Sequence, residues 1–136
     1  MATAGYSGTP LIKKLGITPS MKVLLINTPA EYYDWIQMDL TKQLVTKNEI
    51  PAFIHLFVTS MNEFENEMKK LKPLYKKNTS VITWVSWYKK TAKMNTDVTE
   101  DNIRRYALSN GLVDVKVCAV SELWSGLKLV VPLAKR

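Results

Sequence analysis

The feature that most constrains this chain is a continuous apolar run that leads at once into the start of a helix. Val23–Ile26 holds four apolar residues in succession, which is typical of a strand covered on both faces. Thr28, Pro29 and Glu31 then supply a cap, a first-turn proline and an acidic partner, so we expect a capping box to open a helix here. A strand that passes directly into a helix is the basic unit of an α/β protein.

The turn between this strand and this helix lacks the residues that usually hold a cofactor. In α/β proteins a nucleotide or S-adenosylmethionine docks at the end of the first strand, where glycines let backbone N–H groups approach it. Here the turn reads Asn27-Thr28-Pro29, and Pro29 has no N–H to donate. We therefore expect the frame of a ligand-binding fold without its usual cofactor contacts, and we predict no cofactor.

The remainder of the chain alternates helices and strands before it ends in two adjacent strands. Ser60 and Glu63 form a second capping box, and apolar residues follow at spacings of three and four on one helix face: Met61, Phe64, Met68, Leu71 and Tyr75. Further strands are expected over 52–59, 81–87, 112–120 and 127–131, with another helix over 97–110. The interval 39–50 is open, and 43–46 could form a short edge strand.

The last two strands are close enough in sequence to form a hairpin. The connection 121–126, in which Gly126 would meet the turn geometry, allows them to pair in the antiparallel sense. Because helices separate the earlier strands, those strands are expected to be parallel. The sequence thus predicts one domain over 1–136, with a three-layer α/β fold and a mostly parallel sheet that ends in an antiparallel hairpin.

Two resemblances accompany this order of elements. It is similar to the Rossmann-like fold of S-adenosylmethionine-dependent methyltransferases, whose segments before the first and a later strand resemble 15–24 and 71–74. The chain also resembles, over nearly its whole length, a small bacterial family known only as a domain of unknown function. The segments that carry this likeness are Gly5–Leu11, His55–Ser60, Trp84–Trp87 and Trp124–Leu129. It departs from the family at Tyr88, where proline is usual, and family membership implies no activity.

Composition narrows the location and the partners. The chain has 136 residues, of which 46% are hydrophobic and 23% charged, as in ordinary soluble domains. The stretch 50–62 carries no charged residue but is far shorter than the roughly 20 residues of a membrane helix. The start of the chain has no secretion-signal pattern, and the single cysteine, Cys118, excludes an internal disulfide. We expect a cytoplasmic protein with no membrane association.

The net charge of +7 leaves two readings open. Clustered basic residues could bind the phosphates of nucleic acid. The same charge could simply keep a small protein soluble, which we favour because only Arg104, Arg105 and Arg136 are arginines. Nucleic acid is therefore a possible but not a favoured partner, beside a small anionic ligand or a protein.

No complete set of catalytic or metal-binding residues stands out. His55 is the single histidine and lies within an apolar strand, where a hydrogen-bonded core role is favoured over acid–base catalysis. With one histidine and one cysteine, the chain cannot build a zinc site of the usual type, and we predict no metal. No nucleophile elbow is present either.

The most suggestive positive feature is the segment from Trp84 to Lys93, in which tryptophans precede three lysines. Val85 and Trp87 are expected on one face of the strand, and Trp84 with Ser86 on the other. Trp87 could stack on a ligand and Lys89 hold its anionic group, whereas Trp84 is expected in the core. The predicted ligand-binding residues are Asn27, Thr28, Ser60, Trp87, Lys89 and Trp124, with a lid that includes Tyr6 and Ser7.

These residues favour a non-catalytic ligand-binding or regulatory domain that lacks a glycine-rich cofactor loop. No catalytic residue is assigned. A diverged S-adenosylmethionine-dependent transferase is the first alternative, and a nucleic-acid-binding protein that uses its lysine-rich loops is the second.

Overall fold

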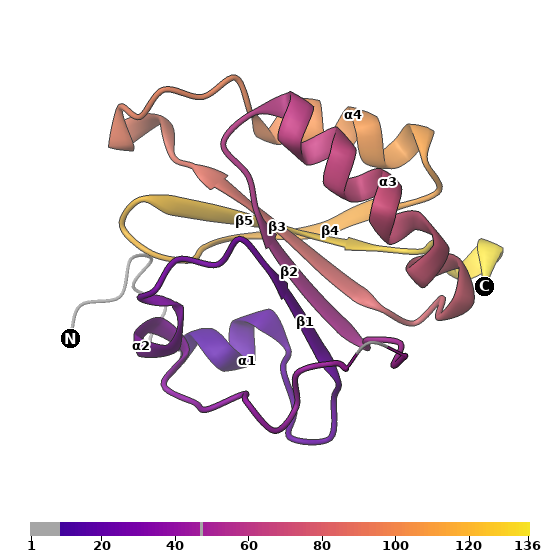
Figure 1. Ribbon diagram of the computed structural model, residues 1–136. Helices are drawn as coiled ribbons and strands as arrows, with labels where there is room; N and C mark the ends of the chain where they lie inside the picture. Colours follow the sequence, from indigo (N-terminus) through magenta and orange to yellow (C-terminus); the bar gives the residue numbers. More distant parts are fainter. Residues whose placement is uncertain (1–8, 47) are drawn as a thin grey trace.

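The computed structural model describes residues 9–46 and 48–136, in which a five-stranded sheet lies between helices on its two faces (Figure 1). The strands follow one another across the sheet in the order β1-β2-β3-β5-β4. Their bounds are Val23–Ile26 (β1), Phe53–Phe57 (β2), Ile82–Tyr88 (β3), Val113–Ala119 (β4) and Trp124–Val130 (β5).

The expectation of a mostly parallel, Rossmann-like sheet is wrong. The β1–β2 and β2–β3 pairs are parallel, but β3–β5 and β5–β4 are antiparallel, so the sheet is mixed. Long crossovers follow β1 and β2 and allow parallel pairing, whereas the short loop 120–123 can join β4 and β5 only as a hairpin. The hairpin then inserts β5 against β3, which makes half of the strand pairs antiparallel.

Four α-helices cover the sheet in the described part of the chain, and most of them are short. They are Leu11–Leu15 (α1), Tyr32–Ile36 (α2), Met61–Lys77 (α3) and Glu100–Ser109 (α4). Figure 1 shows α3 and α4 on one face and α1 and α2 on the other. Two apolar clusters follow from this arrangement, one beneath each pair of helices.

The α3 helix forms as the apolar spacing predicts. Phe64, Met68, Leu71 and Tyr75 are all buried against the sheet, and Met61 is half-buried. The Ser60 hydroxyl accepts a hydrogen bond from the backbone N–H of Glu63 at 3.1 Å, which caps the helix. The amphipathic pattern and the cap thus agree on where this helix begins and which face it buries.

The predicted start of α2 is wrong. The helix begins at Tyr32, its N-cap is Glu31, and no side chain caps it. Asn27 has a φ of 56°, so the chain turns sharply after β1 and does not enter a helix at Thr28. With only five residues, α2 depends on packing of its buried side chains.

Two smaller expectations also change. The possible edge strand over 43–46 is reduced to a single parallel bridge between Leu44 and Val23. Gly126 lies inside β5, not in a turn, because β5 begins three residues earlier than the apolar run suggests. Among the helices of residues 9–46 and 48–136, none is long and apolar enough to cross a membrane.

Candidate ligand-binding site

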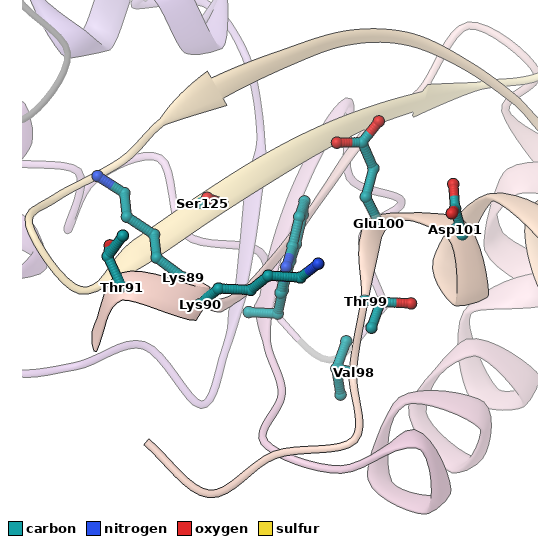
Figure 2. A pocket seen from close by; sticks show the side chains of 9 residues that line it. Lys89, Lys90, Thr91, Val98, Thr99, Glu100, Asp101 and Ser125 are labelled. Carbon is teal, nitrogen blue, oxygen red and sulfur yellow. The ribbon is translucent and has the colours of Figure 1, made fainter. Parts of the chain in front are cut away.

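A pocket of about 410 Å³ lies where β3 ends and α4 begins (Figure 2). Because β1, β2 and β3 are parallel, their carboxyl ends share this edge of the sheet, the edge at which α/β proteins bind ligands. The pocket is lined by Trp87, Lys89, Lys90, Thr91, Val98, Thr99, Glu100, Asp101 and Ser125.

The apolar part of the pocket comes from two largely buried side chains. Trp87 is 7% exposed and Val98 is 3% exposed, and both belong to the apolar cluster beneath α3 and α4. Trp87 lies on the same face as Val85, and Trp84 lies on the other face, as the alternation predicts. The pocket therefore has a rigid apolar wall fixed by the core of the domain.

The basic part follows β3 directly. Lys89 precedes a 3₁₀ turn, Lys90–Ala92 (η1), and the chain leaves that turn through Lys93 in the left-handed region, with a φ of 54°. Figure 2 shows the Lys90 side chain reaching toward Thr99, whereas Lys89 extends away from α4. Lys90 is thus the lysine that faces the start of α4.

The acidic residues on the opposite wall are engaged by one arginine. Arg104 donates to Asp101 at 2.8 Å, to Asp114 at 2.9 Å, and to Glu100. The hydrogen bonds from Asp114 and Glu100 raise the pKa of the Arg104 guanidinium further above its ordinary value. Three carboxylates thus converge on a single cation at the border of the pocket.

The two lysines of the pocket have no such counter-charge. Within residues 9–46 and 48–136, no carboxylate forms an ion pair with Lys89 or Lys90. The pocket therefore offers an anion two cations that are not already paired, next to an apolar wall.

The structure brings only part of the predicted site together. Trp87 and Lys89 line the pocket. Asn27 and Thr28 follow β1, two strands from β3, which corresponds to about 10 Å across the sheet. Trp124 lies on the other face, where its ring stacks on Tyr88 with centroids 4.2 Å apart. These residues share one edge of the sheet but not one pocket.

Ser60 lies at the same edge, but its hydroxyl serves the start of α3. Besides the Ser60 cap, the Glu63 carboxylate accepts from the N–H of Thr59 and the Asp97 carboxylate accepts from the N–H of Met61, each at 2.8 Å. The backbone donors that could attract an anion at this helix start are thus used by the protein's own carboxylates.

The predicted lid residues Tyr6 and Ser7 lie outside the described residues. Sequence reasoning missed Lys90, Thr99 and Ser125 as neighbours of Trp87. Thr99 was recognisable as a helix start, and it accepts a hydrogen bond from the N–H of Asn102 at 3.1 Å. Ser125 carried no signal, because its place beside Trp87 depends on the β3–β5 register.

His55 takes the hydrogen-bonded core role that the sequence favours. Its side chain is fully buried, with Nδ1 2.8 Å from the Tyr32 hydroxyl and Nε2 2.7 Å from the Ser86 hydroxyl. Burial lowers the pKa of His55 to about 3, so the ring is neutral at physiological pH. This polar chain lies beneath α1 and α2, on the face of the sheet opposite to the pocket wall.

No group of three or more histidine, cysteine or carboxylate side chains is arranged for a metal in the described part of the chain. Comparison with protein-family models finds no match, and comparison with curated proteins finds no relative. The resemblance to a bacterial family of unknown function therefore stays a prediction.

Proposed function

We propose that this domain binds a small anionic molecule in the pocket between β3 and α4, as a non-catalytic binding or regulatory module. The observation that carries the proposal is the apolar wall of Trp87 and Val98 with Lys90 directed past it (Figure 2). An apolar or planar part of the ligand would rest on this wall, and its anionic group would contact Lys90 and Lys89. A cytoplasmic location is part of this proposal.

The titratable groups around the pocket favour binding over reaction. Glu100 and Asp101 are both held by Arg104, and His55 is sealed in the core. General acid–base catalysis needs a group that can exchange a proton with the substrate. The unpaired lysines supply attraction and orientation for an anion, which is the task of a binding site.

Native mass spectrometry of the protein purified gently from cells tests the proposal. We expect the wild-type protein to retain a small anionic molecule that the Lys90→Ala and Trp87→Phe variants lose. Lys76→Ala is the matched control, because Lys76 is an exposed lysine in the last turn of α3, at the other end of that helix. Loss of one ammonium that contacts an anion should weaken binding by about tenfold or more.

Three outcomes would overturn the proposal. One is that the wild-type protein and the Lys90→Ala variant carry the same small molecules, or none. The second is retention of S-adenosylmethionine by both, which would favour a diverged transferase. The third is retention of oligonucleotides that are released steeply with salt, which would favour nucleic-acid binding.

A further inference from the structure

The outer edge of β4 differs from the other edge of the sheet in being both open and basic. In the described part of the chain, β4 pairs only with β5, whereas β1 at the opposite edge is bridged by Leu44. An edge strand presents unpaired backbone N–H and C=O groups that can pair with another extended segment. The side chains of Val115 and Val117 are 55% and 50% exposed beside these groups.

A groove of about 440 Å³ runs along this edge, between β4 and α1. It is lined by Thr9, Lys13, Lys14, Lys116, Val117, Cys118 and Ala119. Successive side chains of a strand point to opposite faces. A groove lined by four consecutive residues of β4 therefore follows the edge of the strand and lies beside its backbone.

Lysines gather at this groove without carboxylates. Lys116 lies directly opposite Lys128 on β5, and its ammonium reaches the carbonyl of Lys14 in α1 at 3.3 Å. No ion pair joins Lys13, Lys116 or Lys128 to a carboxylate within the described ranges, and positions 1–8 and 47 contain no Asp or Glu. Like charges placed opposite each other destabilise a sheet, so this arrangement has a cost that folding does not explain.

We propose that β4 receives an extended, acidic segment of a partner protein, which adds a strand to the sheet along Lys116–Ala119. The partner's backbone would pair with the open edge, and its carboxylates would contact the lysines of the groove. Its apolar side chains would cover Val117. This surface is separate from the pocket between β3 and α4, so it does not depend on the function proposed above.

The charges favour an acidic segment over a second copy of this chain. Two β4 edges paired with each other would bring two sets of Lys13, Lys14 and Lys116 together, and repulsion between them opposes such a dimer. The bulge between Asp114 and Lys116 interrupts the first part of the strand, which leaves its second half as the regular edge.

Amide NMR titrations with designed peptides test this proposal. The probe is a short peptide that alternates glutamate and valine, and we expect it to shift the amide signals of residues 116–119. The same peptide with a central proline should bind about tenfold more weakly, because proline interrupts strand pairing. Lys116→Glu should weaken the glutamate–valine peptide by about fivefold or more, whereas the control Lys76→Glu should not.

Several results would overturn it. A peptide that alternates lysine and valine could bind equally well, or the proline peptide could bind as tightly as the probe. Oligothymidylate could shift the same amides at lower concentration than the peptide, which would make the surface a nucleic-acid site. A dimer of the wild-type chain that protects the amides of residues 116–119 would show that a second copy occupies the edge.

Discussion

Tyr32, His55 and Ser86 form a hydrogen-bonded chain inside the core, and they show how single residues set the properties of this domain. Both ring nitrogens of His55 have a hydroxyl partner, so the buried imidazole leaves no polar atom unsatisfied. The ring of Phe57 stacks on the imidazole with centroids 4.5 Å apart. An isolated histidine in an apolar strand indicated a core role, but its two partners come from distant elements and were not predictable.

The buried imidazole makes stability depend on pH. The pKa of His55 is about 3 in the folded state and about 6.5 in the unfolded state. As the pH falls below 6.5, the unfolded state gains a proton that the folded state does not. The free energy of unfolding should therefore fall by up to about 1.4 kcal/mol per pH unit through this window.

Urea unfolding of the wild type and of His55→Gln between about pH 5 and 7 isolates this contribution. The variant should lack the pH slope that the histidine supplies, although it is less stable at neutral pH. Equal slopes for the two proteins would mean that His55 is not buried in its neutral form.

Gly126 shows a second way in which one residue is fixed by its surroundings. A Cβ atom there would lie 3.0 Å from Val120 Cγ2 and 3.1 Å from Trp84 Cε3. We expect Gly126→Ala to lower the free energy of unfolding by about 1–3 kcal/mol, because these contacts overpack the core. Chemical denaturation measures the loss. Val120→Ala removes one contact, so the double variant should lose less than the sum of the two single losses.

At the scale of elements, the helix starts separate structural from functional roles. The box at Ser60 is confirmed because a long amphipathic helix follows it, whereas the box at Thr28 fails because Asn27 turns the chain and α2 is short. Both boxes have the same sequence pattern. Sequence alone could not distinguish them, since the difference lies in how much apolar surface the following helix can bury.

The Ser60 cap gives a prediction that distinguishes a cap from a ligand contact. Ser60→Ala should lower the free energy of unfolding by about 1 kcal/mol, because the N–H of Glu63 loses its acceptor. Ser60→Asp should retain most of the stability, since aspartate also caps helices. Affinity for the molecule retained in native mass spectrometry should stay within about twofold in both variants. A Ser60→Ala protein of full stability and abolished binding would assign Ser60 to the ligand.

At the scale of the whole molecule, the number and type of elements could be predicted, but their order across the sheet could not. The apolar runs of β1, β2 and β3 indicated buried strands, and these three are parallel neighbours. The antiparallel half depends on which strand of the hairpin enters the sheet. β5 is buried along most of its length and β4 is largely exposed, so β5 lies inside and β4 at the edge.

The candidate site was predictable to a similar extent. The edge of the sheet and the pair Trp87 and Lys89 followed from the position of polar and aromatic residues after β3. The partners Thr99 and Ser125 arrive from α4 and β5. Their contribution rests on long-range pairing and on the path of the 93–99 loop, which Thr96 fixes by donating to the carbonyl of Thr59 at 2.7 Å.

The most direct test of the central claim is an NMR titration of the protein with the small anions extracted from its own cells. The account predicts that the indole N–H of Trp87 and the amides of Lys90 and Thr99 shift together, and that these shifts disappear in Lys90→Ala. The indole of Trp84, which donates to the carbonyl of Leu15 at 2.8 Å, should stay unchanged as an internal control. Shifts confined to other surfaces, or no shifts at all, would contradict the account.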